Sequence, residues 1–538
     1  MYDILIRNGI LLDGAGNEGY KADIGIKDGL IAAIGTQLDE PAGEIIDAQG
    51  KYVSPGLIDI HRHADANVFT PSFGEIELSQ GLTTIVNGNC GLSISPCPEP
   101  YKNQILDFLE PIIGDADHSA PIETVESYYR CVENQGLPLN VGSCIGNGTV
   151  RMAAKGFENG ELSPEELNRV HAFLREGLDA GALGVTMGIV YAPENCYDLN
   201  GFIKALEPMK DYNVPLVTHI RGYGDLLHKS LNEVIAVAKA LDVPLHISHF
   251  MAVGKQNWGV GLNEALAILD RARNDGMQIS CDVYPYTAGA SQLIQILPPW
   301  YQDGGVTEIV KRLSDPVKRR ELVEILKKPQ TTFENLVYSS GWDSLLITTV
   351  GLEKNQQYVG KTITEIAQMQ GKDPYDCAFD LLIEENCNVT MVIFITDERD
   401  ILNILRYPYS SVISDSIYPK SGIPHPRLYG AFPKVLSEYV RDRKLLELPA
   451  VIRKMTSEPA KLYRIGKKGL LREGYDADIA VFDLNEIGTQ ATYTDARRLG
   501  QGMYRVIVNG KVAYSEGHMT GQKAGRLLRR KDESLANQ

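Results

Sequence analysis

Cysteine is scarce in this chain, which has 8 cysteines among 538 residues and no regular spacing between them. Disulfide-stapled secreted domains are short and dense in cysteine, so the composition excludes a disulfide scaffold. The first residues, 1–7, predict a strand and lack the basic start of a signal peptide. We therefore expect reduced thiols and a cytoplasmic protein.

Long apolar runs and an excess of positive charge are also absent. No apolar stretch in the sequence approaches the ~20 residues that a membrane helix needs. The formal net charge is −16, whereas sequence-independent nucleic-acid binding requires Lys and Arg to neutralise phosphates. The composition predicts neither a membrane nor a nucleic-acid partner.

A His-x-His pair ends the apolar segment at residues 56–61. Side chains two apart on a strand share a face, so His61 and His63 would project together while Arg62 points away. Two imidazoles on one face can bind one metal ion. An isolated His-x-His also occurs near ordinary turns, so the residues at other strand ends decide between the two interpretations.

Four further strand-like segments end in side chains that bind metals. These are Cys90 after 82–86, His219 after 214–218, His249 after 243–248 and Asp415 after 411–414. Side chains at the carboxyl ends of different strands meet on one face of a parallel barrel. Together with His61 and His63, they predict a metal site.

Strand and helix patterns alternate between residues 55 and 430, as in βαβ units. The clearest helix spans 165–180, with Ser163 as its cap and Gly181 at its end. Strand candidates lie near 58, 84, 141, 185, 217, 247, 281 and either 393 or 412. We predict an α/β fold with a (β/α)8 (TIM) barrel over 55–430 and a helical extension over 431–465.

Both chain ends are rich in short strands and turn residues such as Asn8-Gly9 and Asn509-Gly510. Neither end can hold a core alone, so residues 1–54 and 466–538 are expected to pair into a small β-sandwich. Residues after about 520 are polar and basic and predict a solvated tail or a strap. Residues 291–350 break the strand-helix rhythm and predict an insertion, either a lid or a surface decoration.

Several motifs follow one another along nearly the whole chain. They include the strand at 55–63, Gly-Asn-Cys-Gly at 88–91, Thr-His-Ile-Arg at 218–221, Ile-Ser-His at 247–249 and His-Pro-Arg-Leu-Tyr-Gly at 425–430. In this order they resemble the amidohydrolase superfamily and, within it, the N-acyl-D-amino-acid deacylases (D-aminoacylases). The resemblance implies a β-sandwich plus a metal-bearing barrel that hydrolyses the amide bond of a small-molecule N-acyl-D-amino acid.

The resemblance also implies a zinc cofactor. Cys90, His219 and His249 would hold one tightly bound ion, and thiolate with imidazole suits zinc. His61 and His63, with Cys90 bridging, would form a second and weaker site.

The remaining roles follow from the same resemblance. Asp415 would be a metal ligand and the general acid/base that moves the proton from water to the leaving nitrogen. Arg427, Tyr191 and Tyr284 would bind the substrate carboxylate, helped by Ser291. Preference for D substrates rests on the resemblance alone.

Three departures from the family pattern concern substrate recognition. Arg62 and Ala64 stand where relatives have Thr and Asp, and Ser416 replaces a common Gly. Ala290 occupies the usual position of the carboxylate-binding serine, with Ser291 one place later. The alternatives are hydrolysis of a cyclic amide, as in hydantoinases and dihydropyrimidinases, and a non-catalytic scaffold. Homo-oligomerisation is left open.

Overall fold

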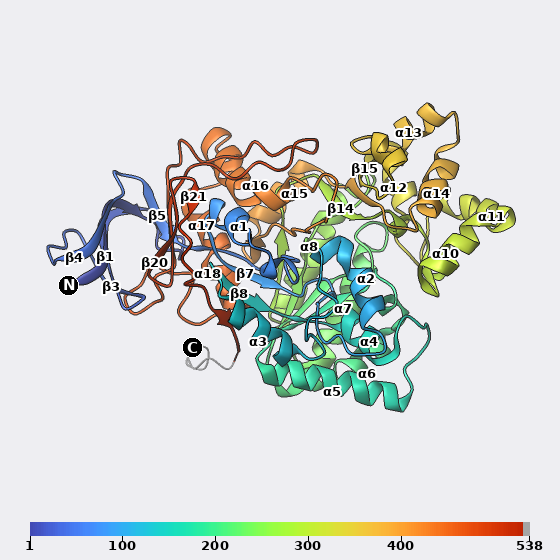
Figure 1. The fold of residues 1–538 in the computed structure, drawn as a ribbon, viewed down its shortest axis with the longest axis horizontal. Coiled ribbons are helices and arrows are strands. Elements are labelled where there is room, and N and C mark those ends of the chain that lie inside the picture. The colour runs from blue at the N-terminus through green and yellow to red at the C-terminus, as the bar shows by residue number, and fades with distance from the viewer. Residues whose placement is uncertain (531–538) are drawn as a thin grey trace.

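The computed structural model describes residues 1–530, and residues 531–538 of the expected tail lie outside the described part. Over the described residues the chain forms a mixed α/β structure with four hydrogen-bonded sheets. In Figure 1 one sheet lies at the left, the parallel strands lie in the centre among helices, and the insertion projects at the right.

Two of the sheets are parallel, with strand orders β22-β8-β7-β6 and β17-β13-β12-β11-β10-β9. Their strands are β6 (Leu57–Asp59), β7 (Leu82–Asn87), β8 (Asn140–Ser143), β9 (Ile145–Gly146), β10 (Val185–Gly188), β11 (Leu216–His219), β12 (Leu245–Ile247), β13 (Ile279–Val283), β17 (Ser410–Val412) and β22 (Leu527–Leu528). Strands β8 and β9 follow each other directly, and a parallel bridge between Arg62 and Ser416 links the carboxyl ends of β6 and β17. Of the two candidates, the strand near 412 is therefore the one that joins the parallel strands, through its pairing with β13.

Helices separate most of these strands. They include α3 (Val125–Gln135), α4 (Asn147–Lys155), α5 (Pro164–Ala180), α7 (Leu227–Leu241), α8 (Val260–Asn274), α15 (Glu398–Arg406), α16 (Arg427–Lys434), α17 (Leu448–Met455) and α18 (Ser457–Leu462). Helix α5 confirms its sequence signals, because the Ser163 hydroxyl accepts a hydrogen bond from the Glu166 N–H and Gly181 ends the helix at φ 101°. Among residues 1–530, no helix combines the length and apolarity needed to cross a membrane.

The two chain ends pair, as predicted, in one nine-stranded sheet. It contains β1 (Tyr2–Leu11), β2 (Tyr20–Lys27), β3 (Leu30–Gly35), β4 (Ala42–Asp47), β5 (Tyr52–Pro55), β18 (Ile479–Phe482), β19 (Met503–Val508), β20 (Lys511–Ser515) and β21 (His518–Met519). Strands β5 and β18 join the halves, with Tyr52 opposite Phe482. The sheet has its own apolar cluster, which includes Ile24 and Ile479.

One local prediction about the chain ends was wrong, and of the two alternatives for the segment after 520 the strap describes it. Asn8-Gly9 is no turn, because β1 continues through it with a register shift between Ile6 and Gly9, and Asn8 has φ 59°. Asn tolerates positive φ, so the same dipeptide suits a bulge. The segment after 520 is also not solvated throughout, since β22 is buried and pairs with β8; the described part is a strap.

The insertion is longer than the predicted 291–350. An antiparallel sheet of β14 (Ala288–Gln292), β16 (Thr390–Phe394) and β15 (Leu345–Thr349) forms its base. Its α-helices are α9 (Pro299–Gln302), α10 (Gly305–Ser314), α11 (Pro316–Leu326), α12 (Leu336–Ser340), α13 (Ile363–Gln370) and α14 (Pro374–Glu384). The strand near 393 belongs here, which explains the surplus strand in the barrel count.

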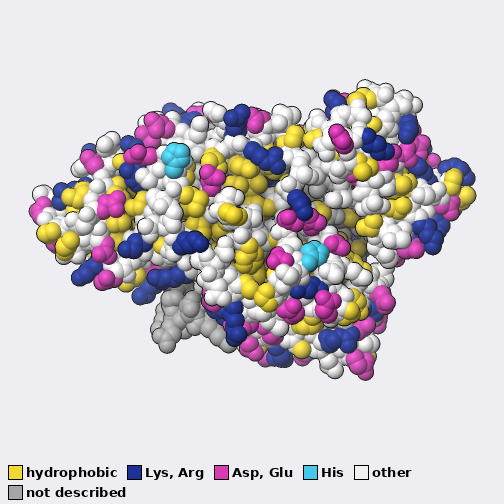
Figure 2. Space-filling view, viewed as in Figure 1, with side chains coloured by type: hydrophobic (Ala, Val, Ile, Leu, Met, Phe, Trp, Pro, Cys, Tyr) yellow, Lys and Arg dark blue, Asp and Glu magenta, His cyan; other side chains and the backbone are white. Residues whose placement is uncertain are grey.

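On the face of the molecule that Figure 2 shows, Lys and Arg side chains intermingle with Asp and Glu side chains.

Candidate metal centre

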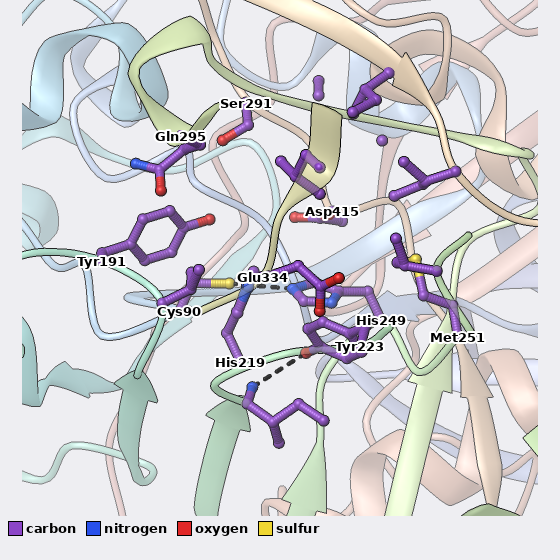
Figure 3. Close-up of a pocket in the computed structure, with 18 of the residues that line it drawn as sticks. Cys90, Tyr191, His219, Tyr223, His249, Met251, Ser291, Gln295, Glu334 and Asp415 are labelled. Carbon is purple, nitrogen blue, oxygen red and sulfur yellow. Dashed lines mark hydrogen bonds between the residues drawn. The ribbon is translucent and has the colours of Figure 1, made fainter. Parts of the chain in front are cut away.

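The six predicted ligand residues converge at the carboxyl ends of the parallel strands. His61, His63, Cys90 and Asp415 have ligand atoms within 4.8 Å of one another, and so do Cys90, His219 and His249. Cys90 belongs to both groups. Its Sγ lies 3.2 Å from His61 Nε2. It lies 3.5 Å from His249 Nε2, as Figure 3 shows.

Three of these residues occupy unusual backbone conformations. Cys90, His249 and Asp415 have φ of 54°, 32° and 50°. Such values are uncommon for residues other than glycine and concentrate at functional sites. Hydrogen bonds hold them in place: the Asp415 N–H donates to the His61 carbonyl at 2.9 Å, and the His249 N–H donates to Asp282. The strand ends therefore aim these side chains inward.

Asp282 is a positioning residue that the sequence analysis missed. Its carboxylate accepts from His246 Nε2 at 2.9 Å and lies 3.6 Å from His61 Nδ1. His246, although it precedes His249 by three residues, thus turns away from the ligand cluster. A carboxylate behind a ligand histidine fixes the ring orientation. The sequence signal for Asp282 was an acidic residue within the apolar pattern of β13, because a buried charge needs partners.

Asp415 lies between the histidines and Arg427. Its Oδ1 is 3.4 Å from His61 Nε2 and 3.5 Å from His63 Nε2, and its Oδ2 is 2.9 Å from Arg427 Nη1. Burial alone would raise the pKa of Asp415, but Arg427 and His61 outweigh burial and hold that pKa well below its usual range. Asp415 is therefore ionised near neutral pH.

The donor set fits a divalent metal. Burial lowers the pKa of His249 to about 4, and burial together with His249 places the pKa of His219 well below its usual value. Both rings are thus neutral, which is the form that binds metals. Burial raises the pKa of the Cys90 thiol, so a thiolate there requires a cation. The buried Nδ1 atoms of His63 and His219 have no hydrogen-bond partner among the described residues.

Arg62 does point away from the ligand cluster, as predicted, and is fully buried. Its guanidinium donates to Asp59 at 3.1 Å and to Glu77 at 2.8 Å. Asp59 in turn accepts from the N–H groups of His61 and Ser414, each at 3.2 Å. Arg62 thus completes a charged network that ties the end of β6 to the end of β17 behind the metal ligands.

A cavity of about 120 Å³ opens above the cluster. The four predicted substrate residues, Tyr191, Tyr284, Ser291 and Arg427, all line it. The Arg427 guanidinium lies 4.6 Å from the Tyr284 ring centre. The Tyr191 ring lies 5.0 Å from the His219 ring, and Figure 3 shows Tyr191 and Ser291 on the same side of the cavity.

Other lining residues carried no signal in the sequence. They are mostly apolar, such as Met251, but include the polar Arg221, Gln295 and Glu334. Glu334 belongs to the insertion and reaches the loop after β11, where it accepts from the Gly224 N–H at 2.8 Å. No local sequence pattern indicates that contact.

Comparison with known proteins agrees with this geometry. A model of the amidohydrolase family matches residues 361–514. The chain is 29% identical to a D-aminoacylase of Alcaligenes xylosoxydans xylosoxydans over 98% of both chains. It is also 29% identical to an N-acyl-D-glutamate deacylase of the same organism, over 99% of this chain and 98% of the relative.

Solved structures give the same picture. The N-acyl-D-glutamate deacylase from Bordetella bronchiseptica, complexed with zinc and a phosphonate inhibitor, superposes with a TM-score of 0.81 and 28% identity, covering 98% of this chain and 99% of that chain. An L-hydantoinase from Arthrobacter aurescens covers 98% of this chain and 100% of that chain, at a TM-score of 0.56 and 16% identity. The second match is evidence for the fold alone.

Proposed function

The chain belongs to the amidohydrolase family, and we propose that it is a zinc-dependent hydrolase of N-acyl-D-amino acids. It would cleave the linear amide bond to a carboxylic acid and a free D-amino acid. The observation that carries the proposal is the convergence of Cys90, His219 and His249 with Asp415 and Arg427 in one cavity. The whole-length similarity to a D-aminoacylase and an N-acyl-D-glutamate deacylase supports the same reaction.

Cys90, His219 and His249 would hold the tightly bound zinc, and His61 and His63 with Cys90 would form the weaker site. Three protein ligands leave a coordination position open, as in catalytic zinc sites. When bound, zinc would lower the pKa of a water ligand to about 7 and polarise the substrate carbonyl. Asp282 would keep the His61 ring oriented through the 3.6 Å approach to Nδ1.

Asp415 would act as the general acid/base. Its carboxylate is ionised and lies beside both histidines of the His-x-His pair, so it can accept the proton of the attacking water. It would then transfer that proton to the nitrogen that leaves as the amine.

Arg427 would bind the α-carboxylate of the substrate. Its planar guanidinium matches a carboxylate in geometry and charge, and its Nε has no hydrogen-bond partner among residues 1–530. Tyr191, Tyr284 and Ser291 would add neutral donors. Ser291 faces the cavity from β14, which supports its role although it lies one place after the usual serine.

The proposal extends to the architecture. The bridge between β6 and β17 and the continuity of β8 with β9 support a closed (β/α)8 barrel over 55–430, followed by helices at 431–465. The joint sheet of the chain ends, with its own core, supports a separate β-sandwich unit of 1–54 and 466–538. The insertion would rest on the barrel through β14 and β16. A cytoplasmic location and a homo-oligomer stay predictions.

The test is amine release from matched N-acetyl-D- and N-acetyl-L-amino acids, with zinc measured on the same sample. D-selective cleavage by a zinc-containing protein is the expected result. Zinc without cleavage of either enantiomer, but with ring opening of a hydantoin, would contradict the proposal in favour of a cyclic amidase. A protein that retains no stoichiometric zinc and cleaves nothing would fit a scaffold.

A further inference from the structure

The insertion contributes a carboxylate to the cavity wall. Glu334 precedes α12 and lines the cavity, and its Oε2 accepts the Gly224 N–H at 2.8 Å. A Cβ added at Gly224 would lie 2.3 Å from Glu334 Oε1, so a side chain at this position would displace the carboxylate. Glu334 is thereby held against the loop that follows the metal-binding His219.

This carboxylate has no positive counterpart. Among residues 1–530, no Lys, Arg or His forms an ion pair with Glu334. Burial, followed by repulsion from Asp225, raises its pKa to about 7 even though the backbone of Gly224 donates to it. A half-buried carboxylate that lacks a cation is unfavourable, and a ligand that brings a cation or a hydrogen-bond donor would relieve it.

The positive side chains of the cavity are already engaged. Arg221 donates to the Glu233 carboxylate at 2.9–3.0 Å and to the carbonyls of Asn195 and Tyr197 at 3.0 and 2.9 Å. Arg427 is the group proposed for the α-carboxylate. No other Lys or Arg of the described chain lines the cavity, so a second carboxylate on the substrate would meet Glu334 without a compensating cation.

The rest of the wall suits a hydrocarbon stem. Apolar side chains make up much of the remaining cavity lining and include Met251, Val253, Leu336, Ile393 and Ile395. A side chain with a methylene stem and a charged or polar tip can bury the stem and place the tip on a polar group.

We propose that Glu334 is a specificity-determining residue, which selects N-acyl-D-amino acids whose long side chain ends in a cation or a hydrogen-bond donor and disfavours acidic side chains. This inference rests on the proposed deacylase function and specifies its substrate class. The similarity to known deacylases leaves this choice open, because a D-aminoacylase and an N-acyl-D-glutamate deacylase are equally identical to this chain.

The test compares Nα-acetyl-D-lysine, N-acetyl-D-norleucine and N-acetyl-D-glutamate on the zinc-loaded full chain. We expect kcat/KM for the lysine derivative to exceed that for norleucine about tenfold, as for one charge-assisted hydrogen bond, with glutamate the poorest of the three. E334Q should bring the lysine-to-norleucine ratio close to unity and improve the glutamate derivative. Glu353, exposed on the same insertion, supplies the control E353Q, which should leave all ratios unchanged.

Each ratio is taken on one protein sample, so partial misfolding of E334Q cancels. A wild-type preference for glutamate, or the same ratios in E334Q, overturns the inference. So does an effect of E334Q on acyl-group preference alone, measured with a series of acyl D-norleucines. Failure of all three substrates would count against the proposed function instead. In that case, calorimetry measures how tightly free D-lysine and free D-norleucine bind, which tests the role of Glu334 without turnover. Equal affinities of the wild-type protein for the two amino acids would overturn that role.

Discussion

The floor and the wall of the cavity are built in different ways. The floor consists of side chains at the ends of short parallel strands, where His61, Cys90 and His219 meet. The wall includes residues of the insertion, where Glu334 contacts a glycine 110 residues away in sequence. Floor residues are fixed by strand periodicity, while wall residues are fixed by a tertiary contact.

The two regions also differ in charge balance. On the floor, Asp415 is matched by Arg427 at 2.9 Å, and Asp282 is matched by His246. In the wall, the Glu334 carboxylate has no cationic partner among the described residues. We infer that the floor, whose carboxylates are paired, sets the chemistry. The carboxylate in the wall is unpaired, and we infer that it sets selectivity when a ligand binds. The predictions below test that separation.

The largest effect is expected on the floor. Asp415→Asn removes the proposed proton carrier while it preserves side-chain volume, so kcat should fall about 10²- to 10⁴-fold. Zinc should stay bound, because Cys90, His219 and His249 are untouched. Steady-state kinetics and zinc analysis on one sample provide the measurement. Near-full activity in this variant would remove Asp415 from the mechanism.

Arg62→Ala should destabilise the fold by about 3–5 kcal/mol, because it leaves the buried carboxylates of Asp59 and Glu77 without their cation. Urea unfolding followed by circular dichroism measures the loss. Arg320→Ala, on the exposed face of α11, is the control and should stay within about 0.5 kcal/mol of the wild type. Equal stability of the two variants would mean that the network does not hold the floor together.

Arg427→Ala should raise KM for N-acyl-D-amino acids about 10- to 100-fold, the effect of losing a hydrogen bond to a charged group. The same variant should discriminate less against an N-acyl amine that lacks the α-carboxylate. Kinetics on this substrate pair separate binding from general damage. An unchanged KM would exclude Arg427 from carboxylate binding.

The smallest effect is expected in the insertion away from the cavity. Asp315 caps α11 by accepting from the Val317 N–H at 2.8 Å, so Asp315→Ala should cost about 1 kcal/mol. Asp315→Asn keeps an acceptor and should cost less. Turnover should not change in either variant. A loss of kcat in Asp315→Ala would show that the insertion and the floor are coupled.

The sequence predicted the floor because each ligand follows a short strand, and the period of two identifies which side chains share a face. It predicted less where the same residue pattern is compatible with two different structures. The segment near 393 is a true strand, but it pairs antiparallel with β14 and β15 instead of joining the parallel sheets. Leu527 and Leu528 lie in a polar segment, and only their pairing with β8 buries them.

Asp282 and Glu334 show two further limits. Asp282 was visible as a buried acid on a strand, but its partners His61 and His246 lie on other strands. Glu334 carries no local signal, because its role depends on how the insertion folds back over the loop after β11. Neither the hydrophobic periodicity of a sequence nor its turn residues indicate long-range contacts of this kind.

The most direct test of the account is the zinc stoichiometry of two matched variants, His219→Ala and His63→Ala. Both replace a histidine of the same cluster by alanine, so any general packing damage should be similar. The account predicts that His219→Ala loses the tightly bound zinc and that His63→Ala retains it after dialysis against a weak chelator. Retention by His219→Ala together with loss by His63→Ala would contradict the proposed division into a tight and a weak site.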